Sequence, residues 1–242
     1  MKTVIAGLIA TLFLNPSLAA ETSSVQIEVS SEWDGLSLSD PRPGRKAPIK
    51  AISIACDDAG CRWGENHPVP RSAVDSFLDQ LLAEPKELVL ADLGITPERV
   101  DALTRSELEG IRRNPTITPK GYEKALEQIR SDWGEIERIV RRYYDPHTVW
   151  TDDSPSIRGR ARWNGTEVNF MSSAQQKFMI PWNIAVKGRA PLTYNSSLSR
   201  ALAALLPSGF VNLQRLRGDH LDDWLMREIR QEVLRRLNTS ER

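Results

Sequence analysis

Apolar and polar residues alternate most clearly over residues 155–171, where two runs are joined by Asn164 and Gly165. An Asn-Gly pair between alternating runs predicts a β-hairpin with a type I′ turn, because both central residues of that turn need positive φ. Counting outward from the turn pairs Trp163 with Thr166, and the register of the two strands follows. We therefore expect the pairing to continue outward from the turn as far as Arg158 opposite Met171.

Side chains alternate between the two faces of a sheet, so this register predicts a core face and a polar face. The core face carries Ile157, Gly159, Ala161, Trp163, Thr166, Val168 and Phe170. The other face carries Arg158, Arg160, Arg162, Glu167, Asn169 and Met171. We expect Phe170 to cover the bare backbone of Gly159. The second face presents three guanidinium groups with one carboxylate opposite them.

Further alternating or β-branched runs predict strands at residues 25–29 and 48–56, with a return strand beginning at Cys61. The apolar run at residues 178–186 contains Pro181, which is better placed at a sheet edge or bulge than in a central strand. Residues 30–48 are rich in Ser, Asp, Gly and Pro and predict a long surface connection.

Apolar residues recur at helical spacing in several other segments. The pattern predicts helices over residues 72–83, 119–144 and 195–206, and a last helix capped by Asp219. Thr96 followed by Pro97 is typical of a helix start, with Thr96 as N-cap. Thr104, three residues before Glu107, has the spacing of a capping box and predicts a separate short helix.

Together these elements predict an α+β fold, in which antiparallel hairpins form a sheet covered by amphipathic helices. We expect a single domain over residues 21–242, with a split near residues 115–120 as the alternative. Residues 48–83 and 156–206 share the order strand, turn, strand and helix. Their sequences are not similar, so coincidence of common units and a true duplication both remain open.

The N-terminal segment has the three parts of an export signal. Lys2 is followed by an apolar run over residues 4–14 and by Ser17, Leu18 and Ala19, which fit a small-residue cleavage site. The run is too short to span a bilayer as a helix. We therefore expect residues 1–20 to be a signal peptide cleaved near Ala19 and Ala20, and the mature chain to be periplasmic or secreted, without an integral membrane segment. A buried N-terminal helix or membrane anchor is the alternative.

Charge and cysteine usage narrow the possible partners and chemistry. The chain has 32 basic and 32 acidic residues. This balance argues against non-specific electrostatic binding to nucleic acid or to an anionic membrane, which needs a clear basic excess. The only two cysteines, Cys56 and Cys61, are predicted to form a disulfide across a turn, as expected of an exported protein. A metal site would need further Cys or His ligands at standard spacing, and none lies nearby.

No recognisable catalytic motif occurs in the sequence. There is no nucleophile elbow, zinc-binding His-Glu-x-x-His, phosphate-binding glycine loop or dinucleotide fingerprint. The three histidines are His67, His147 and His220, and the acids around His220 are explained by the preference of carboxylates for a helix N-terminus. No cofactor is expected. The sequence does not decide whether the chain is an enzyme, but it favours a protein without enzymatic activity.

Two surfaces are candidates for binding. The arginine row of Arg158, Arg160 and Arg162 would suit a carboxylate or phosphate, although exposed sheet faces are often charged without a ligand. Phe178 and Trp182 lie in an apolar run that follows small polar residues, so part of it is either an exposed contact patch or is packed between sheet and helix. The sequence therefore favours an exported, non-enzymatic binding protein of the cell envelope, with an inhibitor-like or immunity-like role as one form. Its partner would be another protein or an anionic envelope component. A periplasmic hydrolase acting on an envelope polymer or ester is the alternative.

Overall fold

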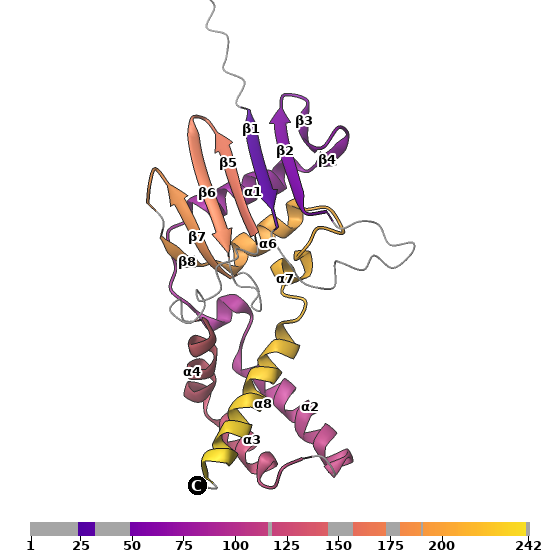
Figure 1. Ribbon diagram of the computed structural model, residues 1–242, viewed down its shortest axis with the longest axis vertical. Coiled ribbons are helices and arrows are strands. Elements are labelled where there is room, and N and C mark those ends of the chain that lie inside the picture. The colour runs from indigo at the N-terminus through magenta and orange to yellow at the C-terminus, as the bar shows by residue number, and fades with distance from the viewer. Residues whose placement is uncertain are drawn as a thin grey trace, which may run out of the picture.

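The computed structural model describes residues 24–31, 49–115, 118–144, 157–172, 180–189 and 191–240. Within them lies one antiparallel sheet, with helices packed on it and beyond it (Figure 1). Its strands are β1 (Val25–Ser30), β2 (Ala51–Asp57), β3 (Gly60–Trp63), β4 (His67–Val69), β5 (Ile157–Trp163), β6 (Thr166–Ser172), β7 (Pro181–Val186) and β8 (Leu192–Tyr194). The α+β prediction is confirmed. The predicted signal peptide, His147 and Phe178 lie outside the described residues.

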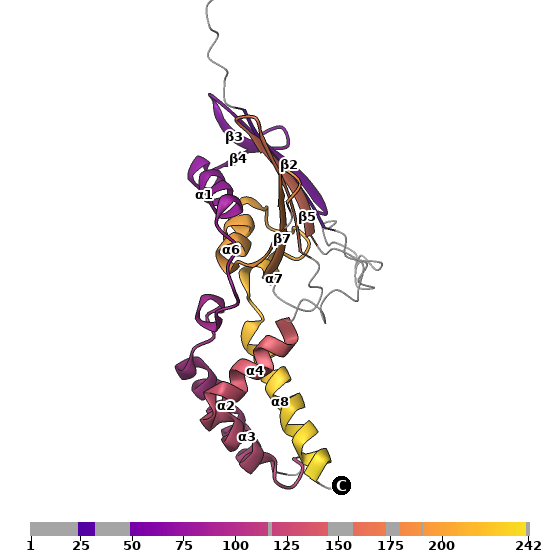
Figure 2. The same cartoon turned by 90° about the vertical axis from the view of Figure 1, so that its left-hand side faces the viewer.

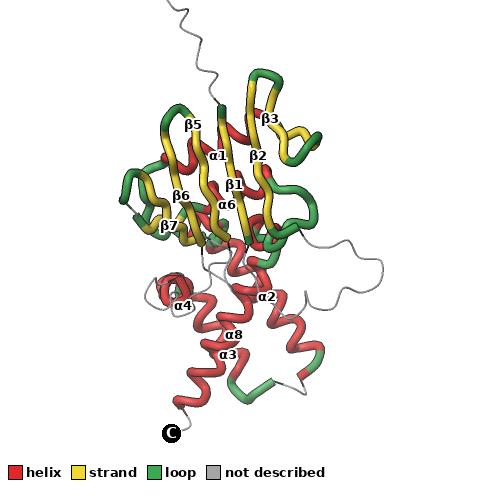
Figure 3. The backbone as a smooth tube through the Cα atoms, turned by 45° about the horizontal axis from the view of Figure 1, so that its top comes forward, coloured by secondary structure: helices red, strands yellow, loops and turns green. Residues whose placement is uncertain are grey.

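The strand order in the sheet is β4-β3-β2-β1-β5-β6-β7-β8, and every neighbouring pair is antiparallel. Figure 3 shows β1 between β2 and β5 in the middle of the sheet. Strands β1 to β4 are followed directly by α1 (Arg71–Leu82) and strands β5 to β8 directly by α6 (Ser196–Leu205), before the chain goes on to further helices. The two four-strand sets meet through β1 and β5, with Glu28 opposite Arg160 at the middle of the paired positions. The predicted echo between two parts of the chain is thus present in the topology, and the first set begins at β1 rather than β2.

The Asn-Gly hairpin has the predicted register. Trp163 pairs with Thr166 and Ile157 with Ser172, while Asn164 and Gly165 have φ of 47° and 71°. Ile157, Ala161, Val168 and Phe170 are buried. Gly159 lies under the ring of Phe170, as the alternation predicts, because a Cβ at this position would overlap that ring. Local turn geometry therefore determines this part of the sheet.

Helices α1 (Arg71–Leu82) and α6 (Ser196–Leu205) cover one face of the sheet and contact each other (Figure 2). The amide N–H of Leu198 donates to the Asn195 side chain, which caps the start of α6. With the short helix α7 (Leu213–Arg217), they enclose the first core, to which Phe77, Phe170 and Trp182 contribute the large aromatic rings.

A second core lies in the helical part of the molecule, at the end away from the sheet (Figure 1). Its elements are the 3₁₀ turn η2 (Leu90–Leu93), α2 (Pro97–Arg113), α3 (Tyr122–Ser131), α4 (Trp133–Tyr144) and α8 (Leu221–Ser240). The helical part therefore combines the segment between the two strand sets with the C-terminal helix. Residues 115–120 join α2 to α3, which both belong to this core. The division into domains remains a prediction.

Two helix predictions need correction. The helix predicted over residues 119–144 is two helices that meet at Asp132, whose carboxylate accepts a hydrogen bond from the Glu135 amide at 3.2 Å and so starts α4. Thr104 does not begin a helix, because α2 continues through it. Its buried hydroxyl donates to the Val100 carbonyl at 2.8 Å instead of capping.

The predicted disulfide is present. Cys56 of β2 and Cys61 of β3 are opposite each other in the ladder, with their Cα atoms 4.0 Å apart, and both side chains are buried in the first core. The bond thus joins the strand next to β1 to a short strand near the sheet edge. No helix in the described part of the chain is both long enough and apolar enough to cross a membrane.

Candidate functional site

The outer face of the sheet, opposite α1 and α6, carries a groove of about 900 Å³. No described helix lies on this face (Figure 2). The groove crosses the middle of the sheet, where the two strand sets meet. Its lining side chains and backbone belong to Glu28, Val29, Ser30, Ala51, Ile52, Ser53, Arg158, Gly159, Arg160, Asn169, Phe170, Met171, Asn183 and Ala185.

The groove exists because small residues line it on both sides of the arginine row. Ala51 and Ser53 occupy the outward positions of β2, and Ala185 occupies one on β7. The alternation in residues 51–57 indicates this placement for β2. The meeting of β1 with β5 joins residues 132 apart in sequence, so the sequence alone does not show that Ser53 and Arg158 share one groove.

Charges in the groove come from Glu28, Arg158 and Arg160. The Arg160 guanidinium donates to the Glu28 carboxylate at 2.7 Å, and these side chains are 36% and 49% exposed, so the pair is open to solvent and to a ligand. Arg158 is exposed at the same end of the groove as Ser30, whose hydroxyl donates to the Arg158 carbonyl at 3.5 Å. The lining residues that the structure describes therefore include two arginines and one glutamate.

Arg162, the third member of the predicted row, does not line the groove. It donates to Glu167 at 2.6 Å, the cross-strand pairing expected from the hairpin register. The hydrogen bond from Arg162 lowers the pKa of the Glu167 carboxyl, so this carboxylate stays ionised and holds the guanidinium. The predicted row is thus divided between Arg158 and Arg160 in the groove and Arg162 beside it.

Trp182 is not a surface contact. Its side chain is fully buried in the first core, and its Nε1–H donates to the Ser199 hydroxyl at 3.0 Å. The centroids of the Trp182 and Phe170 rings are 6.1 Å apart. Of the two readings of the apolar run, the packed one is therefore correct for Trp182. Buried indole rings need a partner for the N–H, and α6 supplies it.

The described histidines form no catalytic or metal-binding cluster. His67 stacks on Trp63 with ring centroids 4.2 Å apart, and His220 lies beside Gln214 and Asp223 at the start of α8. Among the described residues there is no group of three or more His, Cys, Asp or Glu side chains that could hold a metal ion. The described lining of the groove is mainly apolar and adds hydroxyls, amides, guanidiniums and one carboxylate but no histidine, so the groove suits binding by apolar contact, hydrogen bonds and charge.

Comparison with known protein families, with curated proteins and with solved structures gives no match for this chain.

Proposed function

We propose that the protein is an exported, non-enzymatic binding protein of the cell envelope, and that the groove on the outer sheet face takes an anionic segment of another protein or envelope component. The observation that supports the proposal is the joint presence of Arg158 and Arg160 in a groove of about 900 Å³. Ligand pockets typically measure about 300–1,000 Å³. The guanidinium group offers the bidentate geometry that carboxylates and phosphates accept.

Within the described part of the chain no helix covers this sheet face, and the groove is accessible there. Antiparallel sheets commonly pack one face on a core and leave the other in water, so exposure alone does not indicate a ligand. Here the exposed face has a groove across its centre, and the described lining of this groove holds two arginines and one glutamate. Export is supported by the disulfide, which is typical of oxidising compartments, and by the signal-like N-terminal sequence.

The first test removes the charges. In the variant R158Q/R160Q the glutamine amides keep hydrogen-bonding capacity but carry no charge. They also avoid placing a second carboxylate beside Glu28. A partner is first recovered from an envelope extract with the wild-type protein and purified, and its Kd is then measured for each variant. We expect the double variant to bind about tenfold or more weakly, which corresponds to about 1.4 kcal/mol.

The matched control is R62Q. Arg62 lies on the same sheet face, is 44% exposed and is paired with Asp57 at 2.7 Å, but does not line the groove. Its replacement should leave the Kd unchanged. Unaltered binding by R158Q/R160Q, with circular dichroism showing an intact fold, would contradict the proposed surface. So would an extract in which every retained component binds the double variant equally well.

A second pair of variants fills the groove without changing charge. Ser53 lines the groove, whereas Ala55 is exposed on the same face of β2 and lies outside it. S53W should therefore weaken binding of the purified partner, and A55W should not. Equal affinities of the two tryptophan variants would show that the ligand does not enter the groove.

A further inference from the structure

A second pocket, of about 240 Å³, lies where the sheet part meets the helical part. It is separate from the groove and shares no residue with it. Its lining comes from both parts of the molecule: Leu93, Gly94, Arg99, Ile180, Ser196, Ser199, Arg200, Leu216, Arg217, Gly218 and Leu221.

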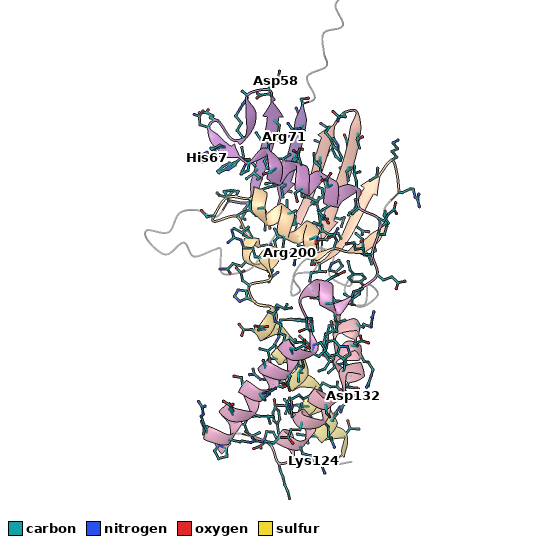
Figure 4. All side chains as sticks on the ribbon, turned by 180° about the vertical axis from the view of Figure 1, so that it is seen from behind. Asp58, His67, Arg71, Lys124, Asp132 and Arg200 are labelled. Atoms are coloured by element: carbon teal, nitrogen blue, oxygen red, sulfur yellow. A yellow bond between two sulfur atoms is a disulfide. The ribbon has the colours of Figure 1, made fainter. Side chains whose placement is uncertain are left out.

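Three arginines from three helices line this small pocket. Arg99 comes from α2, Arg200 from α6 and Arg217 from the last position of α7. Figure 4 labels Arg200 at the back of the molecule, close to α7. No carboxylate occurs among the described lining residues. Like charges brought into one concave site repel one another unless an anion neutralises them.

One of the three guanidiniums is already neutralised. Arg99 Nε donates to Asp222 at 2.6 Å, and Nη1 donates to the Gly94 carbonyl at 3.0 Å, so its position is set from two sides. Arg200 reaches the Ser197 hydroxyl at 3.5 Å, and within the described residues neither Arg200 nor Arg217 forms an ion pair. The described lining of the pocket therefore carries two guanidiniums without a carboxylate partner among the described residues.

The frame around the arginines is held by hydrogen bonds between the two parts. The Ser196 hydroxyl donates to the Asp92 carbonyl at 2.5 Å, and the Tyr194 hydroxyl donates to the Tyr144 carbonyl at 2.5 Å. The Ser196 bond fixes the start of α6, which carries Arg200, against the segment that leads to Arg99, while the side chains of Arg200 and Arg217 are exposed and accessible to a ligand.

We propose that this pocket binds a phosphate-type dianion, and that the bound anion stabilises the junction between the sheet part and the helical part. A charge of two matches these two guanidiniums, and guanidinium forks bind phosphate oxygens in pairs. The pocket is smaller than the usual range for drug-sized ligands of about 300–1,000 Å³, so it suits an inorganic phosphate or a small phosphate monoester. The proposal does not depend on the function assigned to the groove.

The test measures binding by calorimetry and thermal unfolding of the full chain in inorganic phosphate, with ionic strength held constant by sodium chloride. Phosphate should raise the Tm of the wild-type protein, because a ligand that binds only the folded state stabilises it. R200Q and R217Q should each bind phosphate at least about tenfold more weakly and lose most of the Tm increase. Absence of a phosphate-dependent Tm increase in the wild type would overturn the proposal.

The matched control is R113Q. Arg113 lies on α2 like Arg99, is 80% exposed and does not line the pocket, so its phosphate response should equal that of the wild type. In phosphate-free buffer, R217Q should have a Tm equal to or above that of the wild type, because it removes repulsion. A lower Tm there would assign Arg217 a structural role and contradict the proposal.

Two further ligands define the chemistry. Acetate carries one charge and should bind much more weakly than phosphate, and equal affinity would contradict the dianion assignment. Glycerol 1-phosphate distinguishes the sources of the phosphate. Tighter binding of the monoester would identify the pocket as a site for a phosphorylated head group, and tighter binding of inorganic phosphate as a site for the free ion.

Discussion

At the scale of single residues, the close approach of β1, β5 and β6 depends on Gly159. A Cβ at this position would overlap the Phe170 ring and lie 2.5 Å from the Glu28 carbonyl oxygen. The ring of Phe170 also makes an edge contact with Phe77 of α1, with centroids 5.4 Å apart. Gly159 therefore lets one aromatic ring lie flat against the sheet at the centre of the first core, directly behind the groove.

We expect G159A to destabilise the protein by about 1–3 kcal/mol, the usual cost of overfilling a packed core. Urea unfolding of the wild type and the variant measures the difference. Adding F170L in the G159A background should restore only part of the stability, because the clash with the Glu28 carbonyl oxygen remains. If G159A had the same free energy of unfolding as the wild type, the strands would have to separate at this point at little cost.

Residue-level prediction from the sequence succeeded where the determinants are local. Asn164 and Gly165 set the turn, so the register and the position of Phe170 over Gly159 followed by counting. Trp182 shows the limit: its burial depends on Ser199, supplied by a helix 17 residues later. The groove shows a further limit, because Glu28 and Arg160 meet only through the pairing of β1 with β5.

At the scale of elements, a buried carboxylate ties α4 to α8. Glu232 of α8 is 1% exposed and accepts hydrogen bonds from Arg142 of α4 at 3.0 Å and from Arg235 and Arg236 of its own helix. Arg236 also pairs with the buried Glu135 of α4. Burial alone would raise the pKa of the Glu232 carboxyl, but the hydrogen bonds from Arg235, Arg142 and Arg236 outweigh it and lower this pKa to about 2.

Because the pKa of Glu232 is lower in the folded state than its ordinary value of 4.5, the carboxylate contributes stability above about pH 4.5, and this contribution is lost as the pH falls toward 2. At neutral pH, E232Q should lower the free energy of unfolding by about 1.5–3 kcal/mol, the usual range for hydrogen bonds to a charged group. The difference between wild type and E232Q should shrink as the pH is lowered from 4.5 to 2.5. Denaturant titrations across this range measure it.

The control for this prediction is E127Q. Glu127 pairs with Arg112 at 3.3 Å, is 48% exposed and should change stability by less than about 1 kcal/mol, as exposed pairs do. A difference between wild type and E232Q that stays constant down to pH 2.5 would contradict the lowered pKa of Glu232.

Element boundaries in this helical part were predicted less well than the hairpin. The apolar stripe of residues 119–144 continues across Asp132, so its spacing predicts one helix although the chain turns there. Thr104 and Glu107 have the spacing of a capping box, yet Thr104 lies inside α2 because its hydroxyl bonds to the preceding turn. In both cases the outcome depends on which backbone group the polar side chain bonds, and residue spacing alone does not specify that partner.

At the scale of the whole molecule, the chain crosses three times between two cores. It builds the first strand set and α1, leaves to form α2, α3 and α4, returns for the second strand set and α6, and leaves again through α7 to α8. Each strand set contributes four strands and one helix to the first core, and they meet at the groove. The sequence predicted the α+β class, whereas this arrangement depends on pairings between distant segments, of which β1 with β5 is the clearest.

Because the disulfide belongs to the first core alone, removing it should affect the two cores unequally. A cross-link that closes a loop as short as that between Cys56 and Cys61 contributes about 2 kcal/mol by restricting the unfolded chain. We expect C56A/C61A to speed amide hydrogen exchange in β2, β3 and β4 and to leave protection in α3 and α8 close to that of the wild type, since local stability follows local contacts. Reductant should reproduce the effect in the wild type and should change nothing in C56A/C61A. Equal loss of protection in α3 and α8 would show that the two cores unfold as a single cooperative unit, with the junction around Tyr144 and Tyr194 coupling them fully.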